Sequence, residues 1–303
     1  MTVASRLRAG RRTLVTGAGG FVGANLVRRL LADGRDVVAL VRPGGDVWRL
    51  RGLDVELVEA DVREAVPAGF ELVFHLAAHG AYSWQEDEAA IRDTNIRGTA
   101  NALAAGRRVV VAGSSSEYGL KQHAPSEDEP LEPNSPYAAA KAEASALALA
   151  RGAVVLRLYS AYGPWEEPNR LIPTLLARGL AGELPPLVSP LVARDFVHVD
   201  DVCEAFVRAA EAPSGRVYNV GSGRQTTVQE VVEATCRVLG LDAEPAWGSM
   251  ANRTWDTETW VANPQRIRED LGWETRIGLE QGLARTLEWL TTQAAPERYG
   301  LPA

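Results

Sequence analysis

The chain opens, after twelve residues, on an apolar run that leads directly into a glycine-rich turn. Residues 13–16 have the composition of a short buried strand, glycines then recur at every third position, and an amphipathic stretch follows. Such a strand–turn–helix unit grips the pyrophosphate of a dinucleotide, because glycine permits the tight turn, lets backbone approach phosphate and brings the helix close to the strand. The predicted pyrophosphate site comprises Gly17, Gly20, Phe21, Val22 and Gly23.

Short apolar stretches alternate with helical patterns through the first half of the chain, which indicates an α/β fold with a doubly wound parallel sheet. Strands are expected near 13–16, 36–41, 54–59, 71–76, 108–113, 153–159 and 216–220, and helices near 21–33, 87–105, 136–151, 170–180, 200–211, 227–239 and 279–292. Prolines cluster from Pro164 onward and interrupt this alternation. We therefore predict a dinucleotide-binding Rossmann domain at 1–163, rejoined by about 196–220, and a smaller interleaved substrate lobe at 164–195 and 221–303.

A tyrosine and a lysine lie four residues apart near the middle of the chain. Tyr137 and Lys141 follow a helix start at which Ser135 suits the cap and Pro136 the first helical position. Residues four apart share one face of a helix, about one turn from each other. A nearby ammonium stabilises a phenolate and so lowers the pKa of tyrosine from its ordinary value of about 10. Behind a dinucleotide turn, we expect Tyr137 to exchange protons with a substrate at neutral pH.

Three serines and a glutamate follow the strand expected at 108–113. They read Ser114-Ser115-Ser116-Glu117, and strand ends are where open α/β sheets place their sites. A hydroxyl there is able to hydrogen-bond a substrate alkoxide or carbonyl while Tyr137 exchanges the proton. The alternative is a serine-rich turn that satisfies its own backbone, and at least one of the three serines is expected to do only that.

These motifs together resemble the extended short-chain dehydrogenase/reductase family, in its nucleotide-sugar epimerase, dehydratase and reductase branch. The resemblance runs from about residue 12 to about residue 290. Five further stretches are similar to landmarks of that family in order and spacing: residues 74–78, 95–99, 157–164, 194–202 and 253–256. The resemblance implies a Rossmann fold, an NAD(P) cofactor and a nucleotide-diphosphate sugar as the substrate.

The resemblance also implies which residues surround the cofactor. Asp61 and Val62 match the pair that touches the adenine in the family. The other matching positions are Leu76, Ala77, Ala78 and Asn95, together with Tyr137 and Lys141.

The second expected strand departs from the NAD-binding pattern of that family. The pattern puts an aspartate at the strand end to hold the adenosine ribose, but here Val41 occupies that place and Arg42 follows. An arginine pairs readily with a 2′-phosphate, and the missing carboxylate removes the repulsion that NADP would meet. The alternative is that Arg42 stacks on adenine or faces solvent. We expect NAD(P), with a preference for NADP.

The serine region narrows the reaction. Dehydratases of the family carry an Asp-Glu pair there, which eliminates water after oxidation at C4, whereas this chain has Ser115, Ser116 and the single acid Glu117. A 4,6-dehydratase is therefore disfavoured, although a one-residue deletion in the loop would realign Glu117 with the acid of the family. The same ambiguity leaves the catalytic hydroxyl at Ser114 or at Ser115.

Oxidation and reduction at C4 of the sugar need only the hydroxyl, Tyr137, Lys141 and the nicotinamide. A 4-epimerase oxidises C4, lets the 4-keto sugar turn over and reduces its other face with a retained cofactor, whereas a 4-ketoreductase consumes NADPH once. Arg42 favours the reductase and the whole motif set favours the epimerase. A decarboxylase of nucleotide-linked uronic acids uses the same oxidation and stays open. A dinucleotide-binding sensor without catalysis is disfavoured because the tyrosine and the lysine are both present.

The resemblance assigns residues to the substrate as well. Arg194 and Arg253 match arginines that meet the diphosphate, where forked, charge-assisted hydrogen bonds make chemical sense. Ser160 stands where many relatives have asparagine near the sugar phosphates. The expected substrate-binding residues are His79, Ser160, Asn169, Arg194, Arg253 and Asp256.

Composition limits the other possible partners. The net charge is −7 over 303 residues, so the chain has neither the basic footprint of a nucleic-acid binder nor an attraction to anionic membranes. The two cysteines lie in helical patterns and are expected as buried thiols, and the four histidines show no spacing typical of metal ligands. No stretch is long and apolar enough to span a bilayer. We expect a cytoplasmic homodimer that holds no metal.

Overall fold

The computed structural model describes residues 12–82, 84–253, 256–292 and 296–301. The chain divides into two compact units, each formed by several separate segments. Unit 1 consists of Met1–Glu117, Pro133–Arg157 and Ala205–Tyr218, and unit 2 consists of Tyr118–Glu132, Leu158–Glu204 and Asn219–Ala303.

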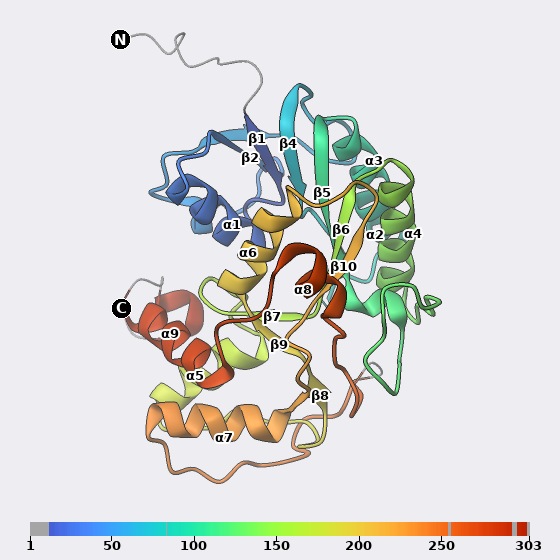
Figure 1. Cartoon of the computed structure of the whole chain (residues 1–303). Coiled ribbons are helices and arrows are strands. Elements are labelled where there is room, and N and C mark those ends of the chain that lie inside the picture. Colours follow the sequence, from blue (N-terminus) through green and yellow to red (C-terminus); the bar gives the residue numbers. More distant parts are fainter. Residues whose placement is uncertain (1–11, 83, 254–255, 293–295, 302–303) are drawn as a thin grey trace. The chain divides into compact units, whose positions relative to one another are not determined.

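A seven-stranded parallel sheet with flanking helices forms the frame of unit 1 and confirms the predicted doubly wound α/β fold (Figure 1). Its strand order is β3-β2-β1-β4-β5-β6-β10. The strands are β1 (Thr13–Thr16), β2 (Val37–Val41), β3 (Glu56–Glu59), β4 (Phe70–His75), β5 (Gly106–Ser114), β6 (Val154–Leu158) and β10 (Val217–Val220). The order reverses between β1 and β4, which pair in parallel, and such a switch point is where this fold binds its ligand.

The helices of this unit lie within the ranges that the sequence predicts. They are α1 (Phe21–Ala32), α2 (Glu88–Arg92), α3 (Gly98–Leu103) and α4 (Pro136–Ala150), with the short turns η2 (Trp48–Leu50) and η4 (Ser115–Tyr118). Ser135 caps α4 by accepting a hydrogen bond from the N–H of Ala138, as its position before Pro136 predicts. Figure 1 shows α2, α3 and α4 side by side on the sheet, in agreement with their mutual contacts.

The helix expected over 87–105 is not continuous. A π-helical turn, η3 (Asp93–Arg97), separates α2 from α3. Within it, the Asn95 side chain donates to the carbonyl of Ile91, and the Thr99 hydroxyl donates to the carbonyl of Asn95. Wide turns of this kind occur often at functional sites, and this one carries a predicted cofactor residue.

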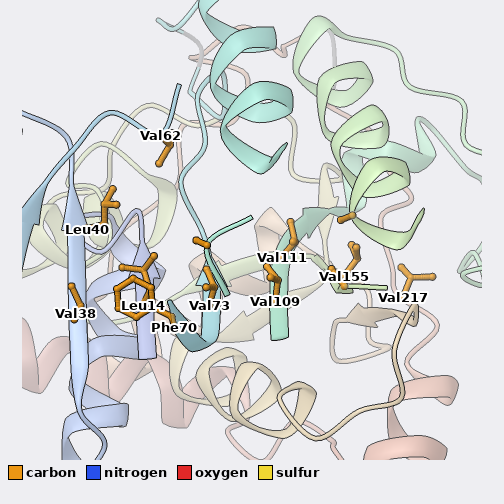
Figure 2. Packing of buried hydrophobic residues seen from close by; sticks show 13 residues of the cluster. Leu14, Val38, Leu40, Val62, Phe70, Val73, Val109, Val111, Val155 and Val217 are labelled. Carbon is orange, nitrogen blue, oxygen red and sulfur yellow. The ribbon is translucent and has the colours of Figure 1, made fainter. Parts of the chain in front are cut away.

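The core of unit 1 is a row of aliphatic side chains that cross the sheet from strand to strand. Figure 2 shows Val38, Leu14, Val73, Val109, Val155 and Val217 in this row. Each of them is at most 9% exposed, and burial of this kind contributes about 1.5–3 kcal/mol for each large aliphatic side chain. The row makes the sheet a rigid platform, so the loops after β1, β4 and β5 start from fixed points.

Unit 2 combines three packed helices with two small sheets. The helices α5 (Leu171–Leu180), α7 (Val228–Leu239) and α9 (Leu279–Thr292) pack on one another. In the small sheets, β7 (Ser160–Tyr162) pairs in parallel with β9 (Phe196–His198), and β8 (Ala193–Arg194) pairs with the antiparallel β11 (Thr226–Thr227). The unit also contains α8 (Gln265–Leu271) and η5 (Pro296–Tyr299), while α6 (Val199–Ala209) begins here and ends in unit 1.

Candidate functional site

The glycine-rich turn between β1 and α1 has the geometry that a pyrophosphate needs. Gly17 has a φ of +67°, and a Cβ atom there would lie 2.6 Å from the backbone nitrogen of Ala77. A Cβ atom on Gly23 would lie 2.2 Å from the carbonyl oxygen of Gly17, so only glycine lets α1 start this close to the strand. No side chain caps the helix at Gly20. The first N–H groups of α1, at Phe21 and Val22, are therefore suited to receive an anion.

A buried chain of hydroxyl and imidazole groups joins the ends of β1 and β4 at the switch point. The Thr16 Oγ1 lies 2.7 Å from His75 Nδ1, and the His75 Nε2 lies 3.1 Å from Thr99 Oγ1. Burial lowers the pKa of His75 to about 3, so the ring stays neutral and able to both donate and accept. Thr16 also receives the N–H of Ala77 at 3.4 Å. Sequence reasoning passed over this chain, although a histidine inside an apolar strand was a visible signal.

The segment after β4 is held by Asn95, the predicted cofactor residue of η3. Its amide nitrogen donates to the carbonyl of His79 at 2.7 Å, while its Oδ1 atom is buried and has no hydrogen-bond partner among the described residues. Leu76 and Ala77 are half-buried, and Ala78 is exposed. The turn thus offers a free acceptor and open backbone beside the glycine-rich loop, as the predicted dinucleotide site requires.

Tyr137 and Lys141 lie on one face of α4, as their spacing predicts. Lys141 is buried and donates to the carbonyl of Ala112 on β5, and burial lowers its pKa to about 8. Tyr137 is half-buried, and its ring edge lies 3.2 Å from the position that a Cβ atom on Gly80 would take. Gly80 thus allows the ring to lie against the loop that follows β4.

The serine cluster separates into members with different surroundings. Ser114, the last residue of β5, is half-buried, and its Oγ lies 2.7 Å from the Oγ of Ser116. Ser115 is 7% exposed and therefore less available to a ligand. Of the two serines that the sequence left open, Ser114 is therefore the more accessible.

Glu117 requires a correction of the role that the sequence left open for it. The side chain is fully buried, and its carboxylate binds Arg157 through an Nε–Oε2 hydrogen bond of 2.8 Å. The other oxygen accepts from the N–H of Ser114 and the hydroxyl of Ser145. A carboxylate held in this way is not free to act on a substrate, so the expectation of a catalytic acid at Glu117 is not supported.

Charged side chains surround the end of β2. Val41 is buried, and the exposed Arg42 comes next. Asp61 accepts hydrogen bonds from Arg63, which lower the pKa of its carboxyl, and Arg42 is near enough to lower it further. Val62 is 7% exposed and packs against Gly98. Asp61 therefore has a partner within the chain that the sequence analysis did not foresee.

Unit 2 gathers arginines around one aspartate. Arg194 donates to the Asp256 carboxylate at 2.8 Å, and its guanidinium lies 5.4 Å from the ring centre of Trp260. The second oxygen of Asp256 accepts the backbone N–H of Arg253 at 2.8 Å. Burial lowers the pKa of Arg194, and the nearby charges of Arg170 and Arg253 lower it further. The charges of Arg170 and Arg253 thus lie near Arg194.

This arrangement changes what Asp256 is expected to do. Both of its carboxylate oxygens are engaged by the arginine segments, so it orients Arg194 and Arg253 and is not itself available to an anionic ligand. Thr254 and Trp255, which complete the predicted stretch 253–256, lie outside the described residues.

The remaining predicted residues are placed as follows. Ser160 lies on β7, where its N–H donates to the carbonyl of Asp195, and Asn169 is exposed just before α5. His79 is half-buried in unit 1, and burial lowers the pKa of its ring. In the same loop, the rings of Tyr82 and Trp84 stack at 4.7 Å with Trp84 57% exposed, which leaves an aromatic surface open to a ligand.

Comparison with known proteins places the chain in a family. Residues 13–221 match the NAD dependent epimerase/dehydratase family. The chain belongs to this family. The match covers the glycine-rich turn, the serine cluster and the Tyr137–Lys141 pair, and it confirms the resemblance drawn from the motifs.

Individual members of the family resemble the chain over almost its whole length. A UDP-glucose 4-epimerase of Mycolicibacterium smegmatis is 35% identical over 93% of this chain and 99% of its own. A dTDP-glucose 4,6-dehydratase of Streptomyces griseus is 36% identical over 91% of this chain and 93% of its own. The crystal structure of a dTDP-glucose 4,6-dehydratase of Streptomyces venezuelae with bound NAD is 29% identical, covers 93% of this chain and 97% of that one, and superposes with a TM-score of 0.84.

Among the described residues, no helix combines the length and the apolar character that crossing a bilayer requires.

Proposed function

We propose that the protein oxidises and reduces C4 of a nucleotide-diphosphate sugar, the chemistry of a 4-epimerase. Tyr137 takes the proton from the C4 hydroxyl during oxidation and returns it during reduction. Lys141 stabilises the phenolate between these steps, and Ser114 donates a hydrogen bond to the sugar oxygen. When bound, NAD(P) supplies the hydride acceptor and donor at C4.

The observation that carries this proposal is the environment of Lys141. Lys141 is 4% exposed, and its ammonium is anchored to the carbonyl of Ala112, one helical turn from Tyr137. A buried cation is costly unless its charge is used or paired, and a phenolate one turn away is the partner that the reaction would create. The neutral Thr16–His75–Thr99 chain and the turn at Gly17 support a cofactor beside it.

The proposal favours epimerisation over dehydration. Elimination of water after C4 oxidation needs a free acid near the reacting sugar. Glu117 is the acid of the serine loop, and it is buried against Arg157 and Ser145. Ser115 and Ser116 cannot take its place, since a hydroxyl of ordinary pKa is a poor general acid.

A 4-ketoreductase that uses NADPH is the second candidate, and the end of β2 favours it. Val41 leaves no carboxylate to hold a ribose 2′-hydroxyl or repel a 2′-phosphate, and Arg42 extends from the next position into solvent. Asp61 lies near Arg42, but the Asp61 carboxylate is already paired with Arg63. We propose on this basis that NADP binds more tightly than NAD.

Replacing Arg42 with alanine should therefore weaken NADP binding by about 1.5–3 kcal/mol, the range for a lost charged hydrogen bond, and leave NAD binding nearly unchanged. Titration of each cofactor by intrinsic fluorescence or calorimetry measures the difference. Arg51→Ala, at another exposed arginine nine residues along the chain, is the control. An equal loss for both cofactors would show that Arg42 stacks on adenine and does not read the 2′-phosphate.

Product analysis tests the proposed reaction. The protein is incubated with UDP- or dTDP-linked glucose and galactose, and the products are separated by chromatography and identified by NMR. Interconversion of the two sugars supports the epimerase. A 4-keto-6-deoxy product would establish a dehydratase. Consumption of NADPH with a 4-keto nucleotide sugar, without interconversion, would establish the ketoreductase. If no nucleotide sugar were changed in any of these assays, the proposal would be wrong.

A homodimer and a cytoplasmic location are part of the same proposal. Exposed or half-buried small apolar side chains lie along α4, with Ala142, Ala146 and Ala150 among them, and a surface of this kind is suited to close packing against a second helix. Sedimentation of the purified chain measures its oligomeric state.

A further inference from the structure

A buried ion pair lies directly under the end of β5. Glu117 is 0% exposed and Arg157 is 3% exposed, and the Arg157 Nε donates to the Glu117 Oε2 at 2.8 Å. The Glu117 Oε1 accepts from the backbone N–H of Ser114 at 2.8 Å and from the Ser145 hydroxyl at 2.9 Å. The carboxylate is thus held from three sides by β5, α4 and β6.

Stability alone does not account for such a pair. Removing two charges from water is costly, and buried ion pairs are often no more stable than apolar side chains of the same shape. The chain also makes room for this carboxylate, because a Cβ atom on Gly113 would lie 2.9 Å from Glu117 Oε1 and 2.8 Å from Val155 Cγ1. The buried Glu117 carboxylate lowers stability by its desolvation and occupies a space that only glycine at position 113 leaves open. We therefore expect a functional reason for this carboxylate.

The position of the pair relative to Lys141 supplies that reason. Lys141 donates to the carbonyl of Ala112, and Glu117 accepts the N–H of Ser114. The two side chains therefore bind the backbone of β5 at positions that are two residues apart. Ser145, which binds Glu117, lies one helical turn beyond Lys141 on α4. The cation and the carboxylate therefore approach the same end of the same strand, next to the proposed catalytic hydroxyl of Ser114.

We propose that Glu117 is a positioning residue for the C4 chemistry: with Arg157 and Ser145 it fixes the end of β5 at Ser114 and keeps the buried Lys141 ammonium charged beneath Tyr137. The catalytic part of this inference rests on the proposed function. The electrostatic part concerns Lys141 alone and is measurable without a substrate.

The other charged groups on the elements around α4 are not placed to keep the Lys141 ammonium charged. The elements packed on α4 are α2, η3, α3 and β5. Their charged side chains are exposed or half-buried, and they are Glu88, Arg92, Asp93, Arg97, Arg107 and Arg108. On α4 itself, Glu143 pairs with Arg92. His75 on β4 is neutral, because burial and the charge of Lys141 lower its pKa to about 3.

The sign of the expected effect follows from the two influences on Lys141. Burial lowers the pKa of Lys141 to about 8, and the Glu117 carboxylate acts in the opposite direction. The ammonium is present below that pH and is lost as the pH rises through it. Without the carboxylate, the ammonium would be lost at a lower pH, and the alkaline limb of any activity that depends on Lys141 would move down with it.

The chain is well suited to a direct measurement, because it contains just two lysines, Lys121 and Lys141. Lys121 pairs with Glu132 in unit 2 and serves as the internal reference. Protein labelled with [ε-¹³C]lysine is titrated by NMR as the wild type and as Glu117→Gln, and Lys121→Arg assigns the signals. We expect the Lys141 midpoint to fall by about one pH unit in Glu117→Gln, the low end of the range for a nearby opposite charge, with the Lys121 midpoint unchanged.

Two further variants make the test decisive. Ser145→Ala removes a neutral hydrogen bond from the same carboxylate but keeps its charge, so the Lys141 midpoint should move by much less than in Glu117→Gln. Glu117→Gln/Arg157→Met removes both charges and leaves no arginine buried without its partner. It replaces the single variant if that variant does not fold. It should lower the midpoint by less than the single variant does, because the loss of the Arg157 charge acts in the opposite direction.

An unchanged Lys141 midpoint in the folded variant without the carboxylate would overturn the inference, even if activity fell. A shifted midpoint in a protein that turns over no nucleotide sugar would uphold the electrostatic link and reject the proposed function instead. The two failures are therefore distinguishable. For an active protein, the alkaline limb of the turnover rate should move in the same direction as the Lys141 midpoint.

Discussion

Tyr137→Phe should lower turnover by about 10²-fold or more and leave cofactor binding intact, because the substitution keeps the ring and removes the proton that the reaction exchanges. The edge of the ring lies close to Gly80 in unit 1, so phenylalanine should preserve the packing. Single-turnover rates and a cofactor titration on the same preparation measure the two effects separately.

Tyr299→Phe is the matched control for this substitution. It removes a buried tyrosine hydroxyl that donates to the carbonyl of Glu166 at 2.7 Å in unit 2, so any effect of it reports a change in stability and not in chemistry. Activity of Tyr137→Phe within a few-fold of the parent would refute the assignment of Tyr137 as the proton carrier.

Arg194→Ala and Arg253→Ala should each cost about 1.5–3 kcal/mol of nucleotide-sugar binding, the range for a lost charge-assisted hydrogen bond. The physical reason is that Asp256 pairs with the Arg194 guanidinium and holds the backbone at Arg253, while the charges of Arg170 and Arg253 lie near Arg194. In a chain of net charge −7, an anionic diphosphate needs such a local concentration of positive charge. Cofactor affinity should not change, since its pyrophosphate is expected at Gly17–Gly23.

Substrate titration of these two variants, with cofactor titration on each, measures the prediction. Arg178→Ala, an exposed arginine in the last turn of α5, controls for the loss of one positive charge. A sugar without its nucleotide should be a very poor substrate, because remote binding energy positions C4 for reaction. Normal substrate binding by both variants, or equal activity on free sugar, would contradict the nucleotide-sugar proposal.

Local signals in the sequence were sufficient for most of the fold. The signals that predict it act over a few neighbouring residues. They are apolar runs of five or six residues, helix caps such as Ser135, and the glycine spacing after residue 16. The missed elements are short. β8 and β11 have two residues each, and β7 and β9 have three, which is too few for any periodicity, and their pairing depends on tertiary contacts.

The sequence predicts those parts of the candidate site that consist of a local motif. It does not predict contacts between residues that are distant in the chain. The spacing of Tyr137 and Lys141 is local, and so is the turn at Gly17. The pairing of Glu117 with Arg157, forty residues away, and of Asp256 with Arg194 needs the folded chain. For that reason the sequence alone predicts a ligand or catalytic role for each acid, whereas the structure shows each engaged by an arginine.

The most direct test of the central claim follows the hydrogen at C4. UDP- and dTDP-linked sugars deuterated at C4 are mixed with the protein and NAD(P), the reaction is quenched within a turnover, and the nicotinamide and the sugar are analysed by mass spectrometry, with Tyr137→Phe in parallel. Our account predicts one deuterium on the nicotinamide in the wild type, and far less in the variant over the same interval. Deuterium that stays on the sugar, or that exchanges into water without reaching the nicotinamide, would contradict it.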